Sequence, residues 1–326
     1  MNHTILLVAA GMMLAGALHT ALAQTAYPNR PVRVIVTVGP GAGIDSFARV
    51  VTKELSDRAG QQFFVDNRPG AGTIIGTQLV AKAKPDGYTL LLTTSSFGIT
   101  PAIYRSIPYD PFRDFAPIMV TVSNPNVITV HPSVPAKTIG ELIALAKTRA
   151  KQGDPILYAS GGAGTNGHMA TALFENMAGI HMMHVPYKSG PLGAIDLMAG
   201  QVAVMTDPMG SLMPYVRTGK LRALAVTSAR RATAAPDVPT VAESGVPGYE
   251  SAQWYGLFGP AATPQDILTW LHKEHTAVLH LPSVKARLAV DGLDVVANSP
   301  NEFAAFIKAE IAKWTQVVKA QGMDLM

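Results

Sequence analysis

Cysteine is absent from the 326 residues, which excludes disulfides, thiolate metal sites and cysteine nucleophiles. Charged residues are scarce, at 15% against 48% hydrophobic residues, so the composition is that of a packed globular protein and not of a disordered chain. The formal net charge is only +4 and Lys and Arg form no run, so the sequence offers no basic stripe for nucleic acid. A chain of this length can form two domains with full cores.

Signatures of catalysis and of metal binding are missing as well. The sequence contains no Gly-x-Ser-x-Gly elbow, no His-Glu-x-x-His and no P-loop. His181 and His184 lie three apart on an expected strand, so they point to opposite faces and are poor co-ligands. His272 and His275 could share a helix face, but the two residues between them are charged and indicate a solvated surface. The sequence therefore predicts no catalytic residue, no metal site and no cofactor.

The longest apolar stretch lies at the N-terminus. Residues 5–18 are apolar and rich in small side chains, and Ala21-Leu22-Ala23 supplies the small-x-small pattern that precedes signal-peptide cleavage. We therefore expect residues 1–23 to be a signal peptide, cleaved after Ala23, and the mature protein to be periplasmic. Because no later segment has the length and hydropathy of a membrane span, we also expect it to be soluble.

Two glycine loops are the main feature of the mature chain. The β-branched stretch 32–38 runs into the first loop, with Gly39, Gly41 and Gly43, and an amphipathic helix begins near Ile44. The second loop, at 159–168, follows another strand pattern. Such loops place N–H groups and a helix N-terminus at the carboxyl end of a strand, where α/β sheets bind anions. Strands alternate with helices throughout, which predicts an α/β fold, and we expect the two loops to face each other across a cleft.

Two alternatives remain for the first loop. A dinucleotide-binding loop would need a third glycine at position 44, which is Ile44. A glycine-rich turn without a ligand is the other alternative, and it is weakened because the same pattern recurs at the second loop. In the first loop, Asp45 is interpreted as a helix cap more readily than as a ligand contact.

Other candidate polar residues follow the same predicted edge of the sheet. The second loop offers backbone and side-chain donors without a fixed charge, which suits a carboxylate. Ser95 and Ser96 end one expected strand, Tyr187 follows another and Asp207 ends a third. For each of these, a turn, surface or capping role is the alternative to ligand contact. Trp254, on a later strand, is interpreted as a core residue.

Nearly the whole mature chain resembles one known family. The matching segments occur in a single order: Tyr27-Pro28-Asn29-Arg30-Pro31, residues 39–45, Asn67-Arg68-Pro69-Gly70-Ala71-Gly72, Pro85-Asp86-Gly87-Tyr88, residues 109–117, His131-Pro132-Ser133-Val134-Pro135, His184-Val185-Pro186-Tyr187-Lys188, residues 219–226 and Pro236-Asp237-Val238-Pro239-Thr240. Together they are similar to the Bug family, the extracytoplasmic solute-binding receptors of tripartite tricarboxylate transporters.

The resemblance implies a type II periplasmic binding protein, in which two Rossmann-like lobes joined by two crossing strands close like a Venus flytrap. Lobe one would be 24–124 plus 251–326, and lobe two 125–250. The implied partners are a small organic carboxylate and membrane permease subunits, with no nucleic acid, and the receptor would be a monomer. The carboxylate could be a dicarboxylate, a tricarboxylate, an acidic amino acid, or an aromatic or nicotinic-type acid.

The same resemblance implies a set of ligand contacts. They are Gly43, Ile44, Asp45, Ser95 and Ser96 in lobe one, and Ala163, Gly164, Thr165, Asn166, Tyr187 and Asp207 in lobe two. One position departs from the family loop, which commonly reads Gly-Gly-Gly-Thr-Asp, because Ile44 stands in place of threonine. The change removes a hydroxyl donor and favours a ligand with an apolar portion.

The sequence leaves three candidate functions for this chain. The first is a receptor that binds a carboxylate and delivers it to a permease without any chemistry. The second is a ligand-sensing subunit for a membrane signalling protein, which would use the same closure. The third is an exported α/β enzyme that uses Asp45, Asp207 or His168.

Overall fold

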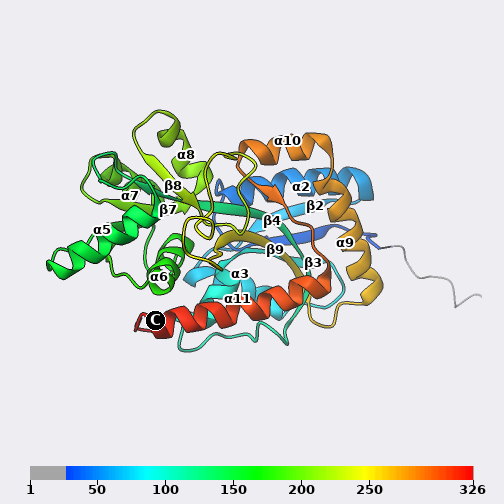
Figure 1. The fold of residues 1–326 in the computed structure, drawn as a ribbon. Coiled ribbons are helices and arrows are strands. Elements are labelled where there is room, and N and C mark those ends of the chain that lie inside the picture. The colour runs from blue at the N-terminus through cyan, green and yellow to red at the C-terminus, as the bar shows by residue number, and fades with distance from the viewer. Residues whose placement is uncertain (1–26, 326) are drawn as a thin grey trace, which may run out of the picture.

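The computed structural model describes residues 27–325, so the predicted signal peptide lies outside the described residues. In this part of the chain one ten-stranded sheet contains the path β2-β1-β3-β9-β4-β7-β5-β6, and β10 and β8 pair with β4 off this path (Figure 1). The strands are β1 (Val32–Val36), β2 (Phe63–Asn67), β3 (Thr89–Thr94), β4 (Phe115–Val130), β5 (Leu157–Ser160), β6 (Met183–Pro186), β7 (Val204–Pro208), β8 (Arg222–Val226), β9 (Ala252–Pro260) and β10 (Asp294–Val295).

Helices cover this path of strands. They are α2 (Gly43–Ala59), η1 (Ala71–Thr73), α3 (Ile74–Ala81), α4 (Ser96–Ile103), α5 (Ile139–Lys151), α6 (Asn166–Ala178), α7 (Gly190–Met198), α8 (Met209–Arg217), α9 (Gln265–Leu279), α10 (Pro282–Val290) and α11 (Pro300–Ala320). No helix within residues 27–325 combines the length and apolar character that a bilayer crossing requires.

The strands form two halves that correspond to the two expected lobes. In the first half β1 pairs in parallel with β2 and β3, and β3 pairs antiparallel with β9. In the second half β5 pairs in parallel with both β6 and β7. The α/β prediction is therefore confirmed, because each half contains parallel strands connected through helices.

The long strand β4 joins the halves. Its first part pairs with β9 and its last part with β7 and β8. The sequence predicts two apolar strands here, 118–122 and 127–130, which run through a proline-rich crossing between the lobes. The structure has one 16-residue strand instead, in which the pairing with β9 shifts register just after Pro117. The second crossing lies beside it, since Ala252 at the start of β9 pairs with Pro125 of β4.

The helix boundaries agree closely with the sequence pattern, with one exception. The sequence predicts a cap at Thr138, and Thr138 caps α5, its Oγ1 accepting from the Glu141 N–H at 3.2 Å. The exception is α4, which was not anticipated and which contains Pro101. This helix follows β3 directly, so its N-terminus lies at the same edge of the sheet as the loop before α2.

The last helix, α11, packs against both halves. Its first turns bury Phe303 and Ile307 in the first half, together with Phe258. Further along, Trp314 and Val317 lie in the core of the second half. Figure 1 shows the helix running beneath the sheet toward α6, where Gln321 Nε2 donates to the Ala172 carbonyl at 3.2 Å. The C-terminal region is therefore shared between the two cores.

Candidate ligand site

A cavity of about 390 Å³ lies where the two halves meet. The start of α2 and the end of α10 line it from the first half, the start of α8 lines it from the second half, and the crossing strands form its floor. The lining residues are Val38, Ala42, Gly43, Ile44, Ser46, Thr94, Asn124, Pro208, Gly210, Ser211, Gln253, Tyr255, Val290 and Asp291.

The N-terminus of α2 opens onto this cavity. Gly43 and Ile44 are its first two residues, and the first N–H groups of a helix have no partner within the helix. Ala42 precedes them and supplies no side-chain cap. A side chain at Gly43 would place its Cβ 3.0 Å from Tyr255 Oη, so glycine keeps the backbone accessible at this point. Both residues were predicted ligand contacts, and both line the cavity.

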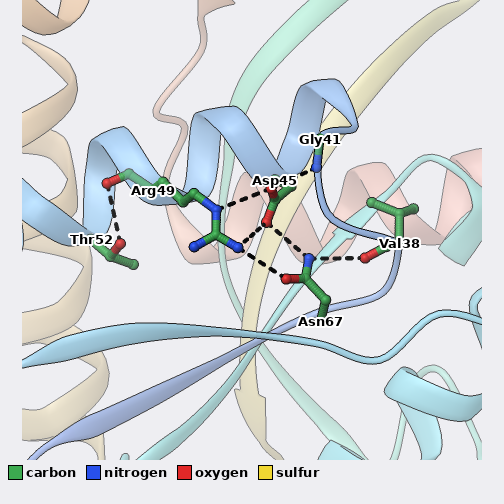
Figure 2. Close-up of polar contacts among 6 residues, drawn as sticks. All are labelled: Val38, Gly41, Asp45, Arg49, Thr52 and Asn67. Carbon is green, nitrogen blue, oxygen red and sulfur yellow. Dashed lines mark hydrogen bonds and ion pairs between the residues drawn. The ribbon is translucent and has the colours of Figure 1, made fainter.

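The Asp45 carboxylate forms hydrogen bonds with other residues of the protein (Figure 2). Its carboxylate accepts from the Gly41 N–H at 2.9 Å, from Asn67 Nδ2 at 2.9 Å and from Arg49 Nε at 3.1 Å. Burial raises the pKa of this carboxyl, but the hydrogen bonds from Arg49, Gly41 and Asn67 outweigh it and hold the pKa below its usual value. Asn67 also donates to the Val38 carbonyl at 3.0 Å. The Asp45 side chain thus holds the glycine loop in shape without capping α2, because its backbone donor, Gly41, lies before Ala42 and outside the helix.

A second helix N-terminus, that of α8, faces the cavity, and the sequence analysis missed it. Pro208 precedes the helix without a side-chain cap, and Gly210 and Ser211 lie in its first turn. The signal was present, because Asp207 ends a predicted strand. The strand-to-helix rule that identified α2 applies here without a glycine-rich loop.

The second glycine loop lies next to this cavity and does not line it. Within the loop the Thr165 hydroxyl donates to the Gly162 carbonyl at 2.7 Å, so this donor is already used. Asn166, the first residue of α6, reaches across the halves, and its Nδ2 donates to Ser95 Oγ at 3.2 Å. The structure therefore brings two predicted contacts together, one from each half. Of the remaining predicted residues, Ala163 and Gly164 lie in the loop beside Thr165, and Ser96 begins α4.

Two stacked histidines lie next to the second loop and are linked to it by hydrogen bonds. The rings of His168 and His184 are parallel to within 18°, with their centroids 4.1 Å apart. His168 Nδ1 accepts from the Gly164 N–H at 3.1 Å, and Ser160 Oγ, 2.7 Å from His184 Nε2, accepts from the Gly162 N–H. Burial and the nearby charge of His184 lower the pKa of His168 to about 4. Both imidazoles are thus neutral near pH 7 and help to hold the loop.

Tyr187 and Asp207 lie in the second half, outside the cavity lining. The Tyr187 hydroxyl donates to Asp196 at 2.7 Å, and burial together with Asp196 raises the pKa of Tyr187 to about 12. The Asp207 carboxylate lies against the backbone of Gly190, at the start of α7. Burial raises the pKa of Asp207 to about 7, against a smaller lowering by the Ser211 hydroxyl. Asp207 does not line the cavity itself, but its hydrogen-bond partner Ser211 does.

The floor of the cavity contains an acceptor without a partner. Asn124 is 8% exposed, and among the described residues nothing donates to its Oδ1. Its neighbour Tyr255 is also buried, and burial followed by the charge of Asp291 raises the pKa of Tyr255 to about 12. The sequence singled out the adjacent Trp254, which is a core residue as interpreted, its Nε1 donating to Glu310 at 3.1 Å. Because strand residues alternate between faces, Tyr255 takes the cavity side.

Metal coordination has no support in residues 27–325, where no three His, Asp or Glu side chains converge on one point. The cavity lining in this part of the chain also contains no Lys, Arg or His. An anion there would be held by N–H and hydroxyl donors.

A comparison with protein families gives an independent line of evidence. The sequence profile described as "Tripartite tricarboxylate transporter family receptor" matches residues 47–323. The chain belongs to this family. The match begins inside α2 and ends beyond α11, so it extends over the second half and most of the first.

Individual relatives agree with this assignment. The receptor is 34% identical to the protein BugT of Bordetella pertussis over 328 residues, which cover 100% of each chain. A Rhodopseudomonas palustris protein solved with adipate is 35% identical, with a TM-score of 0.76 and coverage of 91% of this chain and 98% of that one. MatC from the same species, solved with bound malate, is 30% identical, with a TM-score of 0.73 and coverage of 90% and 100%. The Bug-family resemblance and the two-lobed fold are therefore confirmed.

Proposed function

We propose that this chain is a periplasmic solute-binding receptor that captures a small organic carboxylate between its two lobes and delivers it to the permease of a tripartite tricarboxylate-type transporter. The observation that carries the proposal is the cavity between the halves, onto which the N-termini of α2 and α8 both open. Each N-terminus has unpaired N–H groups and the positive end of a helix dipole. Adipate and malate in two neighbours of this fold support a carboxylate as the ligand.

Closure of the lobes is the proposed mechanism. When the halves approach, water leaves the cavity and the two helix N-termini converge on the anion. The ligand stabilises the closed form because only that form makes contacts from both sides. The Asn166–Ser95 hydrogen bond joins the halves in the present structure, and it also stabilises the closed form.

The wider organisation belongs to the same proposal. We place lobe one at 24–124 plus 251–326 and lobe two at 125–250, with the end of α11 packed on lobe two. We also propose the signal peptide at 1–23, cleavage after Ala23 and a monomeric receptor without a cofactor. The second glycine loop and Ser96, Tyr187 and Asp207 remain proposed ligand contacts, reached directly or through ordered water.

Catalysis is not part of the proposal. Asp45 is bound by three donors and is therefore a poor general base. Nδ1 of His168 already accepts a hydrogen bond from Gly164. The hydrogen bonds of Asp45 and of His168 are both consistent with a receptor that makes and breaks no covalent bond.

Thermal unfolding of ligand-stripped protein in the presence of a carboxylate library tests the function. A ligand at a hundred times its Kd should raise the free energy of unfolding by about 2.7 kcal/mol, because it binds the folded state only. Neutral amides of the same acids are the matched controls, and they should give no shift. A library that leaves the unfolding temperature unchanged would refute the proposal.

A further inference from the structure

Resting on the proposed function, we infer that His168 is a positioning residue for ligand binding, and that the receptor closes fully on its ligand only while this imidazole is neutral. His168 is not one of the proposed ligand contacts. It acts through the second glycine loop and through Asn166, which joins the two halves. Ligand binding should therefore weaken in mild acid and release a proton from His168.

The shape of the second glycine loop depends on hydrogen bonds. Gly162 and Gly164 have φ values of 124° and 75°, which glycine adopts readily but which leave its backbone many alternatives. The Gly164 N–H donates to His168 Nδ1 at 3.1 Å. The Gly162 N–H donates to Ser160 Oγ at 3.1 Å, and that oxygen lies 2.7 Å from His184 Nε2. Both glycines are therefore held through a histidine.

Only the neutral form of His168 can make its hydrogen bond. A backbone N–H is always a donor, so Nδ1 of His168 must accept and the ring proton lies on Nε2. A second proton would sit on Nδ1, opposite the Gly164 N–H, and would break the contact. The Ser160 hydroxyl donates to the Gly162 carbonyl at 3.1 Å, so its oxygen can accept from His184 in either charge state. The acid-sensitive contact is therefore the one at His168.

The groups around His168 oppose its protonation in the present structure. The ring of His184, on β6, is stacked on it at 4.1 Å between centroids, and that of Tyr158, on β5, lies at 6.5 Å. Burial and then His184 lower the pKa of His168 to about 4. The carboxyls on the neighbouring elements are Glu175, further along α6, and Asp207, at the end of β7. Because burial raises the pKa of each to about 7, in mild acid they provide little negative charge to balance an imidazolium.

The second glycine loop leads directly into the contact between the halves. Asn166 begins α6 two residues before His168, and its Nδ2 donates to Ser95 Oγ of the first half at 3.2 Å. If the loop loses its bond to His168, Asn166 is no longer held in place for Ser95, and the closed form loses stability. In the open form the Ser95 contact is absent, so the loop can change shape and His168 can titrate near its usual pKa of about 6.5. Closure and protonation of His168 therefore oppose each other.

Isothermal titration of the ligand-stripped mature protein tests this inference. The ligands are adipate, malate and any further acid that the carboxylate library identifies, at pH 7.5 and pH 5.5. Titrations at pH 6 in two buffers of different ionisation enthalpy give the number of protons released. His168→Asn keeps an acceptor for the Gly164 N–H but does not titrate, and His168→Ala removes the acceptor. His280→Asn, at the exposed end of α9, is the control.

The comparison with His168→Asn isolates one titrating group, because Asp207, Glu175 and the acid itself titrate in both proteins. Between pH 7.5 and pH 5.5 the natural protein should lose about fivefold more affinity than His168→Asn. At pH 6 it should release about 0.7 more protons per ligand bound. His280→Asn should behave as the natural protein does. At pH 7.5, His168→Ala should bind about fivefold more weakly than His168→Asn.

Equal acid losses of affinity in the natural protein and in His168→Asn, or equal proton release, would overturn the inference while the proposed function stands. The same conclusion would follow if His168→Ala bound as tightly as the natural protein at pH 7.5. If His168→Ala does not fold, the pH comparison and the proton count still decide the matter. If no acid binds to the natural protein at pH 7.5, the proposed function itself fails, and the inference fails with it.

Discussion

At the scale of single residues, neighbouring positions of the first glycine loop have different roles. Asp45 holds the loop through three donors, and Gly43 leaves its backbone open to the cavity. Ile44 is 2% exposed, and its side chain belongs to the core of the first half. The substitution of isoleucine for a hydroxyl residue therefore changes the ligand side of the loop mainly by removing a donor.

Gly43→Val should weaken carboxylate binding at least about tenfold and leave the fold intact. A Cβ there would lie 3.0 Å from Tyr255 Oη, and the valine methyl groups would project toward the cavity that the N–H groups face. Isothermal titration and circular dichroism would measure the two effects. Gly39→Ala is the matched control, because nothing lies within 4 Å of a Cβ at that position. Normal affinity in the Gly43 variant would place the ligand elsewhere.

Protonation of His168 should reduce the free energy of unfolding in mild acid, whereas the raised pKa of Asp207 acts in the opposite direction. The pKa of His168 is about 4 in the folded state against about 6.5 in the unfolded chain, so the unfolded chain binds more protons between these values. The stability that His168 contributes is complete above pH 6.5 and is lost as the pH falls toward 4, by about 2 kcal/mol at pH 5.

Urea unfolding at pH 7 and pH 5 would measure this loss. His168→Asn, which keeps an acceptor for the Gly164 N–H, should lose less stability between the two pH values than the natural protein. His280→Asn is the control, because His280 is exposed at the end of α9, in the first half and away from the second glycine loop. An equal acid loss in the natural protein and in His168→Asn would contradict the assignment.

At the scale of elements, the sequence predicted what depends on neighbouring residues. The strand at 32–36, the helix after each glycine loop and the Thr138 cap were all expected, because periodicity and capping are local. The continuity of β4 through Pro125 was not expected, since it depends on pairing with Ala252, which is far away in sequence. Helix α4 was also missed, because it begins directly after β3 and contains a proline.

The site was predicted in part for the same reason. Gly43 and Ile44 follow from a local strand–loop–helix pattern, and both line the cavity. The contributions of Ser211, Asn124 and Asp291 depend on how α8, β4 and α10 are brought together. No local pattern reports that arrangement.

Thr138→Ala should lower the free energy of unfolding by about 1 kcal/mol, because the Glu141 N–H at the start of α5 loses its acceptor. Urea denaturation would measure the change. Thr148→Ala on the same helix is the control, since Thr148 is exposed and its hydroxyl donates to the Ala144 carbonyl one turn earlier. A smaller loss for Thr138→Ala than for Thr148→Ala would show that the cap is not needed.

At the scale of the whole molecule, the two halves make contact at the front and at the back of the crossing strands. At the front, Asn166 meets Ser95 beside the cavity. At the back, α11 packs against both cores, with Trp314 fully buried in the second. A substitution at the Asn166–Ser95 contact should therefore change closure of the lobes without disturbing the fold.

Ser95→Ala should weaken ligand binding about fivefold, because the closed form loses one hydrogen bond worth about 1 kcal/mol. Small-angle scattering of the ligand-free variant should show a larger mean radius, and the unfolding temperature should hardly change. Ser106→Ala, at an exposed position, is the control. Unchanged affinity and radius would show that this hydrogen bond does not favour closure.

The position of α11 also has a consequence for how the chain folds. Trp314 and Val317 complete a hydrophobic core whose other members include Met169 and Phe174, synthesised much earlier. During synthesis domains generally fold from the N-terminus onward as units. The core of the second half cannot be completed in that order, because it lacks Trp314 and Val317 until α11 has joined it.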